Sequence, residues 1–74
     1  MRALTTYWEH ETNSEIDTVE HDSRFPAGLN YSRGELIHLV DRQGKGHSLI
    51  IELITHRIDI QEDIHITLVS CKRG

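Results

Sequence analysis

Histidine is the residue type with the clearest capacity for chemistry in this chain, because six histidines occur among 74 residues. They are His10, His21, His38, His47, His56 and His65. Zinc sites need three or four converging ligands, usually including one closely spaced pair. Successive histidines here stand nine to seventeen residues apart, with no HxH or HxxxH pair. We therefore expect no metal and no cofactor, unless an oligomer axis gathers histidines, and we assign them to surface or core positions.

Three polar residues interrupt apolar faces of the expected strands: His38, Glu52 and His56. Residues in such positions are usually core groups that find hydrogen-bond partners. The alternative is that one of them lines a pocket, where burial would shift its pKa. Asp59 and His65 are expected to be neighbours on a polar face, but no serine or cysteine is placed to complete a catalytic set.

No other motif points to catalysis. Cys71 is the only cysteine, and a nucleophilic thiol needs an adjacent base, whereas its expected cross-strand neighbour is Leu53. The stretch QGKGHS at 43–48 lacks the GxxxxGK[ST] pattern and joins two strands instead of opening a helix. We therefore expect no enzymatic activity.

Negative charge is concentrated at the N-terminal end of a chain whose formal net charge is −4. Residues 1–22 carry one arginine and six carboxylates, a net charge of −5. Such a surface steers association with basic partners, and aromatic side chains often anchor interfaces. The leading hypothesis is a small intracellular inhibitor or adaptor that binds a basic surface of another protein; a solvated acidic face is the simpler alternative. The expected partner-binding residues are Tyr7, Trp8, Glu9, Glu11, Glu20 and Asp22.

Two basic loops, 24–33 and 42–47, support a second hypothesis. Arginine and aromatic side chains suit phosphate groups and bases. The chain would then be an oligomeric protein that binds a nucleotide, another anion or nucleic acid. The expected anion-binding residues are Arg24, Tyr31, Arg33, Arg42 and Lys45. Nucleic acid is the less favoured ligand, because no basic footprint extends along the chain.

The elements that must position these residues are strands. Alternating apolar residues predict a three-stranded meander at 35–42, 48–60 and 64–71. A two-residue turn centred on residues 44–45 would place Val40 opposite Leu49. A three-residue loop, 61–63, would place Ile60 opposite Ile64 and separate apolar from polar faces.

The middle strand is long, so we expect a bulge or bend at 55–57; the alternative for 49–57 is a short helix. Upstream, 3–11 reads as a strand, 12–14 as a turn and 15–21 as a second strand, with a short helix at 15–21 as the alternative. Residues 22–34 read as a loop, and we expect Phe25, Leu29 and Tyr31 to fasten it to the core. Residues 72–74 are expected to fray.

These patterns predict one domain, 1–74, with a mainly β fold: a small antiparallel sheet or barrel of four to five strands. Both faces of the meander are apolar, so we expect a homodimer or larger homo-oligomer to cover one of them. The single cysteine favours a cytoplasmic location. We expect no signal peptide and no contact with a membrane, because the longest apolar runs are far too short to span one.

Overall fold

A computed structural model describes residues 2–21 and 31–74, which form five β-strands. These are β1 (Arg2–Glu9), β2 (Ser14–His21), β3 (Leu36–Val40), β4 (Gly46–Asp59) and β5 (Ile64–Arg73). The predicted mainly β fold is confirmed, and each strand of the meander ends within two residues of its predicted boundary. The alternative helices at 15–21 and 49–57 do not form, because isoleucine, valine and threonine favour the extended strands that pair there.

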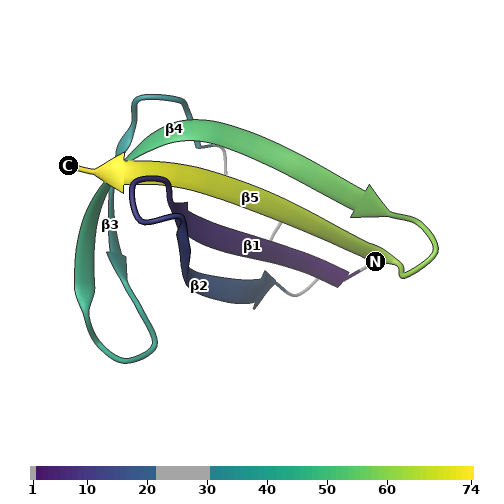
Figure 1. The fold of residues 1–74 in the computed structure, drawn as a ribbon. Coiled ribbons are helices and arrows are strands. Elements are labelled where there is room, and N and C mark those ends of the chain that lie inside the picture. The colour runs from purple at the N-terminus through teal and green to yellow at the C-terminus, as the bar shows by residue number, and fades with distance from the viewer. Residues whose placement is uncertain (1, 22–30) are drawn as a thin grey trace.

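One sheet contains all five strands, in the order β2-β1-β5-β4-β3. Three pairings are antiparallel, as predicted, but β1 and β5 run parallel. Parallel neighbours need a long crossover connection, and here β2, β3 and β4 all lie between the two strands in sequence. Figure 1 shows the sheet curling into a half-barrel, with β3 and the start of β4 turned away from the direction of β1 and β5.

The core lies on one face of the curled sheet, which we call the inner face. Its buried apolar residues are Tyr7, Leu49, Ile51, Val69 and Cys71. The half-buried residues that pack against them are Ile16, Tyr31, Ile37, Leu39 and Ile54. Full burial of one aliphatic side chain contributes about 1.5–3 kcal/mol, so this small set supplies much of the hydrophobic stabilisation. The opposite face is called the outer face below.

The β3–β4 hairpin has a longer loop than predicted. Val40 pairs with Gly46 instead of Leu49. Asp41 causes the difference, because its Oδ1 accepts hydrogen bonds from the backbone N–H groups of Gln43 and Lys45, both at 2.9 Å. These bonds close a wide loop and leave no room for the predicted two-residue turn.

The shifted register decides which side chains reach the core. Ile37 and Leu39 pack against it, whereas the alternate residues Leu36 and Val40 are exposed. His38 lies with the exposed set, and its Nδ1 is 3.1 Å from the Ser48 hydroxyl. His38 therefore interrupts an apolar row, as predicted, but that row is exposed, so His38 is not the core residue that we expected.

The β4–β5 turn also differs from the prediction, by one residue. Asp59 pairs with Ile64, so the loop has four residues, 60–63, and Ile60 is 84% exposed instead of paired with Ile64. Asp59 Oδ1 accepts a hydrogen bond from the Glu62 N–H at 3.0 Å, and Asp63 adopts a positive φ of 56°. The sequence had predicted that Asp59 and His65 pair, but in the structure His65 pairs with Ile58 instead.

The predicted irregularity in β4 exists, but it lies at Glu52 instead of 55–57. The pairing of β4 with β5 shifts between Ile51 and Leu53. A bulge of this kind inserts one extra residue and bends the strand. It lets Leu49, Ile51 and Ile54 all contribute to the core, although their spacing breaks strict alternation.

Most of the predicted loop at 22–34 lies outside the described residues, which resume at Tyr31. Tyr31 packs against the core, as expected of a residue that fastens this segment. The Gly34 N–H then donates to the Ile51 carbonyl at 2.7 Å, and the Ile51 N–H donates to the Glu35 carbonyl at 2.9 Å. The described ranges contain no helix that could cross a membrane.

Candidate functional site

Three of the predicted partner-binding residues are consecutive in β1 but do not share a surface. Tyr7 and Glu9 point to the inner face and are buried, with exposed fractions of 5% and 6%. The Tyr7 hydroxyl lies 2.7 Å from the Tyr31 hydroxyl, and burial raises the pKa of Tyr7. Trp8 points to the outer face, where it is half-buried. Of the three, only Trp8 is placed to meet a partner.

Glu9 belongs to a polar chain that holds one end of the sheet together. Arg73 donates to both carboxylate oxygens of Glu9, at 2.8 and 3.2 Å, and this hydrogen bonding lowers the pKa of Glu9. Arg73 also donates to His47 Nδ1 at 3.2 Å, so that nitrogen must be unprotonated. His47 Nε2 then carries the hydrogen and donates it to Asp41 at 3.0 Å. The last strand therefore does not fray, contrary to the expectation for 72–74.

The other acidic residues divide into paired and unpaired groups. Glu20 accepts hydrogen bonds from Arg2 at 2.8 and 3.3 Å, which lowers the pKa of its carboxyl. Glu11 is exposed in the β1–β2 turn and has no ion-pair partner in the described part of the chain. Glu15 is exposed nearby, where it accepts a hydrogen bond from the Thr18 hydroxyl. Asp22 lies outside the described residues.

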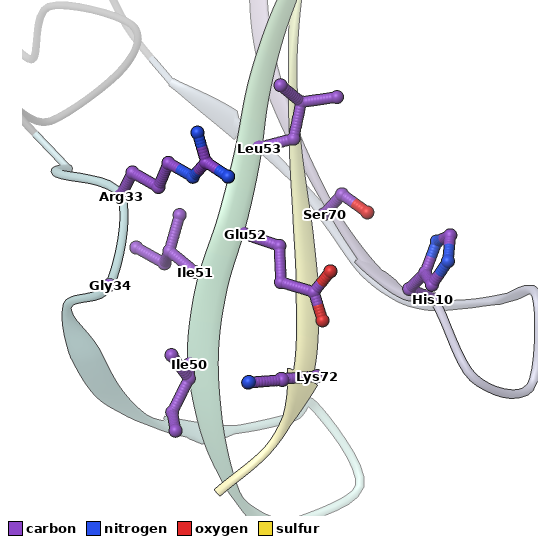
Figure 2. Close-up of a pocket in the computed structure, with 9 residues that line it drawn as sticks. All are labelled: His10, Arg33, Gly34, Ile50, Ile51, Glu52, Leu53, Ser70 and Lys72. Atoms are coloured by element: carbon purple, nitrogen blue, oxygen red, sulfur yellow. The ribbon is translucent and has the colours of Figure 1, made fainter.

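The predicted anion-binding residues are likewise dispersed. Arg24 lies outside the described residues, and Tyr31 is turned toward the core. Arg42 is held by Asp17 and by the Thr18 carbonyl, and Lys45 is exposed in the β3–β4 loop. Arg33 stands apart from them, at the rim of a groove on the other side of β4 (Figure 2).

That groove has a volume of about 520 Å³. Its lining residues are His10, Arg33, Gly34, Ile50, Ile51, Glu52, Leu53, Ser70 and Lys72. The bulge in β4 lies at this groove, since Glu52, the extra residue, and its neighbours Ile51 and Leu53 all line it. Figure 2 shows the Glu52 carboxylate on the same side of β4 as Lys72 and His10, with Arg33 on the other side of that strand.

The groove combines an apolar floor with a mixed polar rim. Isoleucine and leucine side chains of β4 supply the floor, while one carboxylate, one ammonium and one guanidinium group stand around it. In residues 2–21 and 31–74, Arg33 and Lys72 have no ion-pair partner. Such a surface can take an extended peptide or a small charged molecule, since apolar area and a few directed polar groups are what ligand sites generally offer.

The N-terminal hairpin extends this surface. Trp8 pairs with Ser70 of β5 on one side and with Glu15 of β2 on the other, and Ser70 lines the groove. His10, which follows β1, lines it as well. We use the name hairpin surface for Trp8, His10, Glu11 and Glu15 together with the adjoining groove.

Neither a thiol nor a metal cluster gives the described residues an evident catalytic centre. Cys71 is fully buried, and burial, with a smaller effect of Glu52, raises the pKa of its thiol to about 11. Within the described ranges, no group of three or more histidine, cysteine, aspartate or glutamate side chains is placed to hold a metal ion. Cys71 instead behaves as a small core residue, with its Sγ 3.6 Å from the Val69 carbonyl.

Comparisons of this chain with protein-family models, with curated proteins and with solved structures gave no significant match.

Sequence reasoning found part of the site and missed the rest. Glu52 was noticed because it interrupts an apolar row, and Trp8, Glu11 and Arg33 were named for their chemistry. His10 and Lys72 were missed as groove residues, because neither stands out in its local pattern. Only the parallel pairing of β1 with β5 brings the end of the N-terminal strand alongside the end of the last one.

Proposed function

We propose that this chain is a small, non-catalytic interaction protein, an inhibitor or adaptor that binds a basic surface of another protein. The hairpin surface is the part of the molecule that we assign to this contact. The supporting observation is that Glu11 and Glu15 remain exposed and unpaired with any described cation beside the half-buried Trp8.

The contact set differs from the one expected from the sequence. Glu9 and Glu20 are already neutralised by Arg73 and Arg2, so breaking those pairs to meet a partner would cost energy. Exposed carboxylates that form no ion pair with a described residue remain available to guide the approach of a basic partner. A half-buried aromatic side chain next to them offers apolar contact area at little entropic cost.

The experiment that tests this proposal compares two charge reversals. Glu11→Lys alters the hairpin surface, whereas Glu62→Lys makes the same charge change in the exposed β4–β5 turn. Partners captured from host extract are identified and then titrated as purified proteins against each variant. We expect Glu11→Lys to weaken binding of a basic partner at least about tenfold, and Glu62→Lys to leave it unchanged. Equal affinities for the two variants would refute the assignment of this surface.

A second candidate function is the binding of an anion, such as a nucleotide, by an oligomer of the chain. It is favoured by the position of Arg33 and Lys72 around one groove without ion-pair partners in the described residues. Nucleotide affinity would then weaken as salt is raised and would fall in Arg33→Ala. Lys45→Ala serves as the control, because that lysine lies in a different loop.

We also propose that the protein forms a homo-oligomer in the cytoplasm. Several large apolar side chains are exposed in the described chain: Leu36, Val40, Leu53, Ile58 and Ile60. Apolar surface of this kind is often covered by a second subunit. The single cysteine supports the cytoplasmic location. Native mass spectrometry of untagged protein reports the subunit count directly.

A further inference from the structure

Two histidines meet on adjacent central strands, away from the groove. His56 of β4 and His65 of β5 approach with 2.9 Å between His56 Nδ1 and His65 Nε2. Their rings are 5.1 Å apart between centroids and tilted by 50°. They are diagonal neighbours, since His56 pairs with Thr67 and Ile58 pairs with His65. The two histidines belong neither to the groove nor to the rest of the hairpin surface.

The separation of the two nitrogens suits chelation of a metal ion. Imidazole nitrogens bind Zn²⁺ at about 2.0–2.1 Å. Two ligands at that distance stand roughly 2.9 Å apart for a right-angled geometry and roughly 3.3 Å apart for a tetrahedral one. The observed 2.9 Å matches the first value and reaches the second with a small rotation of either ring.

The surroundings leave the pair open to solvent and to an incoming ion. His56 is exposed and His65 is half-buried, on the inner face near the end of the sheet that holds the β4–β5 turn. The Thr67 hydroxyl lies 3.4 Å from His56 Nδ1, a long contact that gives up little if the nitrogen binds a metal. The backbone ladder between β4 and β5 fixes both residues, so little freedom is lost on chelation.

We propose that His56 and His65 form a two-histidine site for a divalent transition metal of the Ni²⁺, Cu²⁺ and Zn²⁺ group. Imidazole suits these ions, in contrast to Mg²⁺ and Ca²⁺, which prefer oxygen ligands. Water or a ligand brought by a binding partner fills the remaining coordination positions. The two protein ligands are His56 Nδ1 and His65 Nε2, an assignment that distinguishes this site from casual binding by surface histidines.

A simple hydrogen bond between two imidazoles is the competing account of the same distance. One ring would donate and the other accept, which needs one neutral ring with an unprotonated nitrogen facing its neighbour. The distance of 2.9 Å between the two nitrogens fits both accounts, but they differ in what Zn²⁺ does. A chelate binds one equivalent of metal through these two nitrogens, whereas a hydrogen-bonded pair gives no site stronger than the other histidines offer.

The test uses untagged full-length protein titrated with Zn²⁺ by calorimetry, and again with Ni²⁺, at neutral pH. The variants are His56→Asn and His65→Asn, and His38→Asn is the matched control because it is another exposed strand histidine. We expect one Zn²⁺ per chain, a Kd that rises at least about tenfold in each site variant, and no change in the control. Circular dichroism of each variant checks that the sheet is intact.

Nitrogen NMR of the wild-type imidazoles gives a readout that does not depend on any variant. We expect Zn²⁺ to shift the signals of His56 Nδ1 and His65 Nε2 and to leave those of His38 in place. The proposal is overturned if Zn²⁺ shifts all the histidines alike, or if its affinity is the same for wild type and both site variants.

Discussion

Arg42 and Asp17 join the two edges of the half-barrel. The Arg42 backbone N–H and guanidinium donate to the Asp17 carboxylate at 3.1 and 3.0 Å, and the guanidinium also donates to the Thr18 carbonyl at 2.7 Å. Asp17 lies in the edge strand β2, whereas Arg42 follows the other edge strand, β3. No backbone ladder connects β2 to β3 in the described sheet, so side chains make the link that a closed barrel would make with its backbone.

Removal of the guanidinium contacts of Arg42 should loosen β2 without unfolding the core. We expect Arg42→Ala to raise hydrogen-exchange rates in β2 and to leave those in β4 and β5 nearly unchanged, because an exposed ion pair contributes little to global stability. Lys45→Ala, in the same loop, is the control. Unchanged exchange in β2 would show that the pair does not hold the edge.

Acid should weaken the fold through four carboxylates. Hydrogen bonds from Arg73, Arg42, Arg2 and His47 lower the pKa values of Glu9, Asp17, Glu20 and Asp41, respectively. A carboxyl whose pKa is lowered in the folded state stabilises the fold at pH values above its usual pKa, which is 4.5 for glutamate and 3.8 for aspartate. This stabilisation is lost as the pH falls through the folded-state pKa. Urea unfolding should show a plateau near neutrality and a decline below about pH 4.5.

The Glu9→Gln variant isolates one of these contributions. Its stability should be lower than that of the wild type at pH 7, and the two curves should converge as the pH falls, because the wild-type carboxyl is then protonated too. A constant difference between the curves at all pH values would contradict the role given to Glu9.

Alkali should act on Tyr7. Burial and the hydrogen bond to Tyr31 raise the pKa of Tyr7 above its usual value of 10.0. A raised phenol pKa in the folded state stabilises the fold below pH 10, and this stabilisation declines as the pH rises above that value. In a phenolate absorbance titration we expect Tyr7 to titrate only as the protein unfolds.

Tyr7→Phe tests the same hydrogen bond at neutral pH. It should lower the free energy of unfolding by about 1 kcal/mol, or the Tm by roughly 4–8 °C. Tyr31→Phe should cost a similar amount, and the double variant should cost less than the sum, because both changes remove one bond. Additive losses would indicate that the two hydroxyls act independently.

The thiol of Cys71 should be almost inert in the native protein. Its pKa of about 11 and its full burial leave little accessible thiolate near neutral pH. We expect slow modification by a thiol reagent at pH 8 and fast modification in denaturant. Fast reaction of the native protein would mean that the sheet opens readily at the end where Glu9 of β1 pairs with Cys71 of β5.

Ile51 of β4 and Ile60, which follows that strand, should respond very differently to replacement by alanine. Ile51 is 1% exposed in the core, and Ile51→Ala should cost about 2–5 kcal/mol. Ile60, 84% exposed in the turn after β4, should tolerate the same change with an effect within about 0.5 kcal/mol. Denaturant titration measures both. Concentration-dependent stability that disappears in Ile60→Ala would instead place this residue in an oligomer interface.

The amino-acid sequence alone determined where the strands lie. Alternation of apolar residues and the glycine- and aspartate-rich breaks between them located the meander, because these signals act over a few residues. The same kind of reading named Trp8, Glu11, Glu52 and Arg33 as residues with a possible role at a surface. It also identified the six histidines, but not which of them would meet.

Only the tertiary structure decided registers, strand neighbours and contacts. Asp41 closes the β3–β4 hairpin with side-chain hydrogen bonds. The turn after Asp59 takes one more residue than predicted. Because strand side chains alternate, a shift of one or three residues in the pairing exchanges the two faces. The parallel pairing of β1 with β5 joins segments more than sixty residues apart in sequence. The groove and the His56–His65 pair both depend on such pairings, which no local pattern can specify.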